Sequence, residues 1–191
     1  MACCALANLV HDAKLLRANI DAAVNAGAVE EVLRALERYP ASSSLQRAGW
    51  SLERMLCSPK GFDAATRAGA LNVCLKVMRA QAGDAEVQDV QCGALMNLTD
   101  EHEANTAAAV AAGAVATVLA ALGKHSMRNS LVVHACGLLS NLFCDERGRA
   151  DAVAGGAQPV LQAIQNAPPG GSQEAAAAAK DALEALSVKR E

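Results

Sequence analysis

Aromatic residues are nearly absent from this chain of 191 residues, which holds one Trp, one Tyr and two Phe although 52% of its residues are hydrophobic. Much of the apolar content is alanine, so we expect a core of small side chains and closely approaching helices. Runs of alternating β-branched residues are also missing, and proline and glycine fall between the apolar stretches. The sequence therefore predicts an all-α fold, as one domain or a short repeat array.

Several functional classes lack their usual signals. The net charge is −3 with both signs mixed, which gives no electrostatic signal for nucleic acid. No apolar run approaches the roughly 18 residues of a membrane span, and the N-terminus has no secretory signal pattern. The sequence contains no phosphate-binding glycine loop of Walker or Rossmann form. We expect no nucleic-acid partner and no membrane span.

Catalytic and metal-binding patterns are equally sparse. The four histidines occur in unrelated contexts, and none is paired with a nucleophile at a spacing that implies a triad. The run "TDEHE" (99–103) gathers three acidic residues and His102. It could attract a metal, although a solvated turn that begins a helix is the favoured interpretation. We expect no enzyme activity and no cofactor.

The seven cysteines show neither C-x-x-C nor zinc-ligand spacing. An odd, scattered set is typical of free thiols in a reducing compartment, so we expect an intracellular protein, with the cytoplasm favoured over the nucleus. Cys3 and Cys4 could be palmitoylated. However, Cys3 has the same repeat phase as Cys92 and Cys136, which favours buried cysteine.

Two families of similar stretches recur along the chain. Stretches such as "AGAVEEVLRAL" (26–36) have their first glycines at Gly27, Gly69, Gly113 and Gly155, which are 42, 44 and 42 residues apart. Stretches such as "ALMNL" (94–98) align on leucines that are 46, 43, 44 and 44 residues apart: Leu6, Leu52, Leu95, Leu139 and Leu183. The shared period predicts an internal repeat.

Each unit reads as a short helix, a glycine turn, a medium helix, a polar loop and a long helix. Ser58 before Pro59, Asp12 and Asp145 are candidate N-caps of the short helices. A three-helix unit of this length resembles the armadillo repeat; HEAT repeats are the nearest rival, and the glycine turn favours armadillo. The resemblance implies a right-handed α-solenoid over 1–191, with repeats at 12–57, 58–99, 100–143 and 144–189 after a lone third helix at 2–11.

The first helix of the array, 2–11, lacks repeat partners and is not polar enough to cap a solenoid. The chain is therefore either a fragment of a longer array or a protein whose open end packs on another chain. The second alternative predicts a homo-oligomer formed through this helix.

An asparagine follows the aligned leucine by two residues in several of the third helices. The positions four and seven residues before this asparagine lie on the same face of the helix as the asparagine itself. The resemblance implies that this face lines a concave groove. Its candidate residues are Arg47, Trp50 and Arg54; Val90, Gly93 and Asn97; and His134, Gly137 and Asn141, flanked by Cys4 with Asn8 and by Asp181 with Ala185.

The resemblance to importin-α-like arrays implies that Asn8, Asn97 and Asn141 bind the backbone of an extended peptide. Arg54 and Ala185 depart from that asparagine ladder, and only Trp50 matches the tryptophan position, which disfavours a nuclear-localisation-signal receptor. The two groove glycines would let a partner approach the helix backbone. Alternatively, the glycines allow tight packing of neighbouring helices, and the asparagines bond to adjacent repeats.

Arg47, Trp50 and Arg54 form one helical stripe that could bind an acidic or aromatic side chain of a partner. An intramolecular cation–π stack, or an ion pair of Arg54, is the alternative. The sequence thus predicts a protein–protein interaction or scaffold module that binds an extended partner segment along the groove. The competing hypothesis is a structural subunit that self-associates or docks through its open ends.

Overall fold

The computed structural model of the chain describes residues 16–40, 42, 52, 55–56 and 58–188. Within these ranges the chain forms eleven α-helices and one 3₁₀ helix, and no strand. The predicted all-α class is confirmed. The predicted residues Asn8, Arg47, Trp50 and Arg54, together with helix 2–11, lie outside the described ranges.

The described helices follow a repeating order of short, medium and long. The first helices of the units are α2 (Leu16–Asn25), α5 (Pro59–Arg67), α8 (Glu103–Ala111) and α11 (Glu146–Ala154). The second helices are α3 (Ala28–Arg38), α6 (Ala70–Ala80), α9 (Ala114–His125) and α12 (Ala157–Asn166). The third helices are α7 (Ala85–Thr99), α10 (Asn129–Leu142) and α13 (Gln173–Ser187), and the 3₁₀ helix η2 (Pro169–Gly171) precedes α13.

A left-handed glycine starts each described second helix. Gly27, Gly69, Gly113 and Gly156 have φ between 70° and 81°, a region that glycine occupies without the steric cost of a Cβ. The sequence alignment had placed the fourth turn at Gly155, which is wrong, because Gly155 has φ −81° and ends α11. A Cβ at Gly155 would lie 2.9 Å from Leu119 Cδ1, so glycine at this position allows Leu119 of α9 to pack closely against the end of α11.

Three of the first helices, α5, α8 and α11, begin at side-chain caps. Ser58, His102 and Asp145 accept hydrogen bonds from the backbone N–H three residues later, at 3.0, 3.2 and 3.0 Å. The predicted caps Ser58 and Asp145 are confirmed, whereas Asp12 lies outside the described residues. Each such cap satisfies one of the free N–H groups at a helix start.

Helices of the same type lie side by side along the stack. The third helices α7, α10 and α13 contact one another in chain order, and so do the second helices α3, α6, α9 and α12. The aligned leucines Leu52, Leu95 and Leu139 are fully buried between these layers. The helices thus form one continuous core, as each unit buries its apolar face against its neighbours.

The core is made chiefly of aliphatic and small side chains. Fifteen of its buried residues are alanine, and Phe143 is the one buried aromatic side chain among the described residues. None of the described helices is long and apolar enough to cross a membrane alone; α8 and α9 meet the length and composition criteria only as a pair bent by 73°.

Candidate functional site

The least buried side of α10 carries three of the predicted groove residues, His134, Gly137 and Asn141. Their spacing of three and four residues places them on one face of the helix. Asn97 of α7 is half-buried as well, whereas Gly93 and Val90, one and two turns earlier, are buried.

This surface continues across the two helices, and we call it the third-helix face: Met96, Asn97, Val133, His134, Gly137, Ser140 and Asn141, all of which are half-buried. The two helices approach closely here. A Cβ added to Gly137 would lie 2.6 Å from Met96 Sδ. The described contact of Gly137 is therefore with the neighbouring third helix, as in the packing alternative.

The two described asparagines of the face differ in their hydrogen bonds. Asn141 Nδ2 donates to Met96 O at 3.1 Å and to Thr99 Oγ1 at 3.2 Å, so its amide N–H groups tie α10 to α7. Its Oδ1 has no partner among the described residues. Asn97 makes no side-chain hydrogen bond to any described residue, which leaves one donor and one acceptor group available on this face.

His134 belongs to a cluster around the buried carboxylate of Asp89. Asp89 accepts hydrogen bonds from Arg128 Nε at 2.9 Å, from Ser130 Oγ, and from His134 Nδ1 at 2.8 Å. Asp89 is on α7 and its three partners are on α10 or at its start, so the cluster joins two consecutive repeats. The sequence prediction placed His134 in the groove but did not identify this partner.

The electrostatics of Asp89 favour its charged form. Burial alone would raise the pKa of this carboxyl, but the hydrogen bonds from His134, Ser130 and Arg128 outweigh burial and lower the pKa below its ordinary value. The charged cluster is thus part of the folded array near neutral pH.

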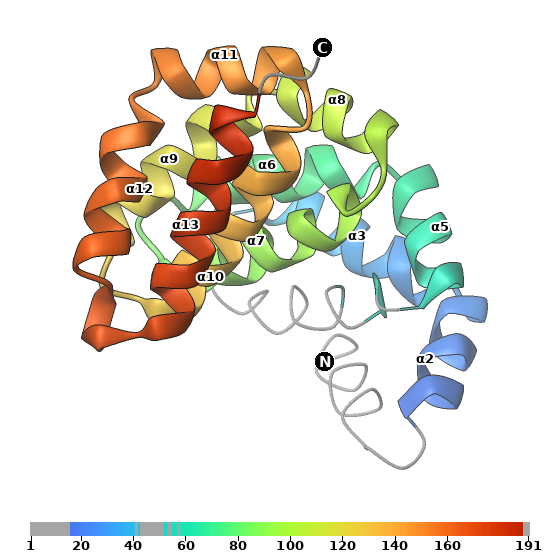
Figure 1. Ribbon diagram of the computed structural model, residues 1–191. Coiled ribbons are helices and arrows are strands. Elements are labelled where there is room, and N and C mark those ends of the chain that lie inside the picture. The colour runs from blue at the N-terminus through green and yellow to red at the C-terminus, as the bar shows by residue number, and fades with distance from the viewer. Residues whose placement is uncertain (1–15, 41, 43–51, 53–54, 57, 189–191) are drawn as a thin grey trace.

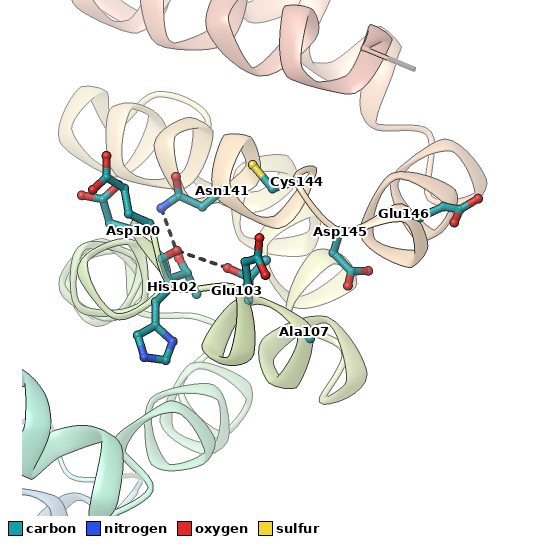
Figure 2. Close-up of a pocket in the computed structure, with 11 residues that line it drawn as sticks. Asp100, His102, Glu103, Ala107, Asn141, Cys144, Asp145 and Glu146 are labelled. Atoms are coloured by element: carbon teal, nitrogen blue, oxygen red, sulfur yellow. Dashed lines mark hydrogen bonds between the residues drawn. The ribbon is translucent and has the colours of Figure 1, made fainter. Parts of the chain in front are cut away.

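A pocket of about 620 Å³ opens where α7 and α10 end and the chain turns into α8 and α11. Figure 2 shows these two corners, with side chains from both directed towards the space between them. We call it the corner pocket, and its lining residues are Thr99, Asp100, Glu101, His102, Glu103, Thr106, Ala107, Asn141, Cys144, Asp145 and Glu146. Asn141 belongs to both the pocket and the third-helix face, so the two are continuous.

The α7–α8 corner differs from the α10–α11 corner by one residue. Leu98 precedes the cap His102 by four positions, whereas Leu142 precedes the cap Asp145 by three. Glu101 takes up the extra residue with φ 49°, and it is the one non-glycine residue with positive φ in the described part of the chain. Such a conformation is uncommon for a residue with a Cβ.

At the α7–α8 corner, an asparagine occupies the position that a glycine occupies at the α10–α11 corner. A Cβ at Gly148 of α11 would lie 2.1 Å from Leu142 O, so glycine is required where α11 meets the end of α10. At the equivalent place in α8 stands Asn105, whose Nδ2 donates to Leu98 O at 2.7 Å. The α7–α8 corner is therefore built around a side chain and an inserted residue.

Five carboxylates surround the pocket: Asp100, Glu101, Glu103, Asp145 and Glu146. None of them forms an ion pair with a residue that the structure describes. The ring of His102 turns away towards Phe62, with the ring centroids 5.3 Å apart. In the described ranges no group of three His, Cys, Asp or Glu side chains could hold a metal ion, so the metal interpretation of 99–103 gains no geometric support.

Sequence reasoning identified residues 99–103 but not the pocket, because its second wall lies about one repeat later. The signal that could have found it is the period itself, since 99–103 and 142–146 have the same phase in successive units. Equivalent corners of adjacent repeats must lie next to each other in a stacked array.

Comparisons with known proteins define the class of fold. No protein-family model matches the sequence, and no curated protein matches it. Solved structures do match. A designed armadillo repeat protein in complex with the peptide (KR)4 is 21% identical with a TM-score of 0.75, and the match covers 97% of this chain and 74% of the other.

Two further structures give the same result. A computationally designed armadillo repeat protein for modular peptide recognition is 20% identical with a TM-score of 0.77, over 96% of this chain and 74% of the other. An engineered protein is 26% identical with a TM-score of 0.79, over 98% of this chain and 43% of the other. The chain is thus an α-solenoid with an armadillo-like repeat fold, as the sequence resemblance predicted.

Proposed function

We propose that this protein is a binding module that holds an extended segment of a protein partner along the third-helix face. The observation that carries the proposal is the polar content of that face. Asn97 has an amide without a hydrogen bond to any described residue, and the Oδ1 of Asn141 has no described partner. An extended peptide presents N–H and C=O groups that side-chain amides of this kind can satisfy.

The structural neighbours support this class of ligand. One was solved with the peptide (KR)4, and another was designed for modular peptide recognition. Their identity to this chain is 20–21%, so they support a peptide as the kind of partner. The sequence of the peptide that this chain prefers depends on its own residues.

We further propose that the protein acts by binding rather than catalysis, as a scaffold inside the cell. Cys74, Cys92 and Cys136 are free and buried, as is typical of cysteines used as small core residues. The competing role, a structural subunit that self-associates through the ends of the array, predicts a dimer. Light scattering on the purified chain separates the two, since a monomer that binds peptide contradicts the competing role.

The experiment is a selection of peptides from a displayed random library, followed by titration of the selected peptides into the Asn97→Ala variant. Loss of one hydrogen-bonding pair at the face should weaken binding about five- to tenfold. The melting temperature should stay unchanged, because the Asn97 side chain makes no hydrogen bond within the described fold.

Asn72→Ala is the matched control, since Asn72 is an exposed asparagine on the second helix α6. It should bind the selected peptides like the wild type. A library that yields no binder, or an Asn97→Ala variant with unchanged affinity for every selected peptide, would contradict the proposed function.

A further inference from the structure

Three histidines lie in the described part of the chain, and each has a ring nitrogen in a hydrogen bond of a different kind. His134 Nδ1 lies 2.8 Å from a carboxylate oxygen of Asp89, and His125 Nε2 lies 2.9 Å from the carbonyl oxygen of Ala82. Because both oxygens accept hydrogen bonds, both nitrogens donate. A second proton on either ring leaves these two bonds in place.

His102 bonds in the opposite sense. Its Nδ1 lies 3.2 Å from the backbone nitrogen of Asn105, in the first turn of α8. A backbone N–H can only donate, so this Nδ1 is the unprotonated nitrogen of a neutral ring. An imidazolium carries a proton on both nitrogens and cannot accept this bond. Histidine is also the side chain whose charge ordinarily changes between pH 5 and 8.

We propose that His102 is a pH-sensitive cap of α8: the neutral ring holds the first turn of the helix, and the protonated ring releases it. The ring is placed for capping by its contact with Phe62 of α5, with the ring centroids 5.3 Å apart. Protonation removes the acceptor and places a cation at the positive end of the helix dipole. The inference is independent of the proposed function, since it concerns the fold of the α7–α8 corner alone.

The carboxylates around the corner give a protonated ring another partner. The charged groups on the elements around the ring are Asp100, Glu101 and Glu103 beside it, Lys60, Asp63 and Arg67 on α5, and Asp145 and Glu146 across the corner pocket. Arg79 of α6 is bound to Ala112 O at the opposite end of α8. Carboxylates are the majority of the groups near the ring, so an imidazolium is drawn from the helix start towards them.

The backbone of this corner is held in an uncommon conformation that release of the cap can relax. Glu101, directly before the cap, has φ 49°, which is disfavoured for a residue with a Cβ. At the α10–α11 corner, Cys144 precedes the cap Asp145 without a positive φ, because that corner has no extra residue. Loss of the His102 cap therefore frees Glu101 to return to an ordinary backbone conformation.

A change at this cap reaches the third-helix face. Asn105 Nδ2 donates to Leu98 O at 2.7 Å and Thr106 Oγ1 donates to Thr99 O at 3.1 Å, so the first turn of α8 is bound to the end of α7. Thr99 Oγ1 in turn accepts a hydrogen bond from Asn141 Nδ2 (Figure 2). A looser first turn of α8 thus loosens the contact that holds Asn141 on the face.

The test is amide hydrogen exchange of the ¹⁵N-labelled chain at pH 7.5 and pH 5.5, with each rate corrected for the intrinsic exchange rate at that pH. Protection of the Asn105 amide should fall about fivefold at the lower pH, as expected for loss of one helix cap. A ring ¹⁵N titration of the same sample should show an unprotonated Nδ1 in neutral His102. The fall in protection should follow protonation of this ring.

Two equivalent amides serve as internal controls. The Gly61 and Gly148 amides donate to the caps Ser58 and Asp145, in the same position of α5 and α11. Serine and aspartate side chains ordinarily keep their charge state between pH 7.5 and 5.5. Protection of these two amides should therefore be the same at both pH values.

The matched variants are His102→Asn and His125→Asn. Asparagine is a preferred N-cap that carries no charge in this range, so His102→Asn should keep the Asn105 amide protected at both pH values. His125→Asn removes a histidine whose bond to Ala82 O survives protonation. This variant should show the same loss of Asn105 protection as the wild type.

Four outcomes would overturn the inference. The first is constant protection of the Asn105 amide while the His102 ring becomes protonated, and the second is a neutral ring that carries its proton on Nδ1. The third is an equal fall at Gly61 and Gly148, which would indicate a general loosening of the first helices. The fourth is a pH response of Asn105 that persists in His102→Asn. None of these measurements uses a peptide, so they leave the proposed function to its own test.

Discussion

Replacing Asp89 tests whether consecutive repeats are joined by the charged cluster between α7 and α10. Its carboxylate is 5% exposed, and it accepts three hydrogen bonds from Arg128, Ser130 and His134. Asp89→Ala removes all three. The side chains of Arg128 and His134 are 39% and 29% exposed, so water can solvate them after the change and reduce the cost.

The expected magnitude follows from these exposures. At about 1 kcal/mol for each screened hydrogen bond, Asp89→Ala should lower the free energy of unfolding by about 3 kcal/mol. For a chain of this size that corresponds to a drop in Tm of about 6–12 °C. Asp89→Asn keeps one acceptor oxygen but turns an N–H group towards donors, and should cost about 2 kcal/mol.

The assay is thermal and urea unfolding followed by circular dichroism. Glu86→Gln is the control, because Glu86 is on the same helix and forms no ion pair with described residues; it should change stability by less than about 0.5 kcal/mol. A Tm of Asp89→Ala equal to that of the wild type would refute the reasoning.

The direction in which the Asp89 contribution to stability changes with pH follows from its pKa. Because folding lowers the pKa of Asp89, its charged form stabilises the fold above the ordinary pKa of an aspartate. That stabilisation is lost as the pH falls from this value through the lowered one. The stability gap between the wild type and Asp89→Asn should therefore narrow under acid conditions, and a gap that widens there would contradict the assignment.

Two further predictions concern packing and thiol reactivity. Gly148→Ala should lower the free energy of unfolding by about 1–3 kcal/mol, because the new Cβ would lie 2.1 Å from Leu142 O. The control is Gly123→Ala, which lies in open space within α9 and should be neutral or stabilising by up to about 1 kcal/mol. Equal effects of the two substitutions in urea unfolding would refute the packing proposed for the α10–α11 corner. Cys144 is exposed, whereas burial raises the pKa of Cys74 to about 12. Peptide mapping after alkylation of the native protein should therefore find Cys144 labelled and Cys74 unlabelled. Labelling of Cys74 would contradict this prediction.

The period of the sequence was sufficient to predict the fold, because burial of the same helix face in every unit leaves the same leucines in each repeat. It placed the fourth turn at Gly155, because Val160, Leu161 and Ile164 then align with the apolar positions of the other units, whereas the turn is at Gly156. Gly156 has the positive φ of the turn, whereas a Cβ at Gly155 would lie 2.9 Å from Leu119 Cδ1 and 3.1 Å from Asp151 O, and only the three-dimensional packing separates these roles.

The candidate site was predictable as a helix face but not as a set of partners. Helical spacing grouped His134, Gly137 and Asn141 correctly on one side of α10. Spacing along one helix carries no information on the neighbouring helix, so the bonds from His134 to Asp89 and from Asn141 to Met96 were missed.

The corner pocket was missed for a related reason. Its walls come from two repeats, and its shape depends on an inserted residue in one corner, which a search for regular periods treats as noise. The extra residue could have been found in the sequence by comparing the spacing from Leu98 to His102 with the spacing from Leu142 to Asp145.

The most direct measurement of the binding claim is an amide NMR titration of the ¹⁵N-labelled chain with a peptide selected from the displayed library. Saturable shifts are expected in the side-chain amides of Asn97 and Asn141 and in the backbone amides of the third-helix face. Shifts confined to the second helices, or no saturable shift at these positions, would contradict the account.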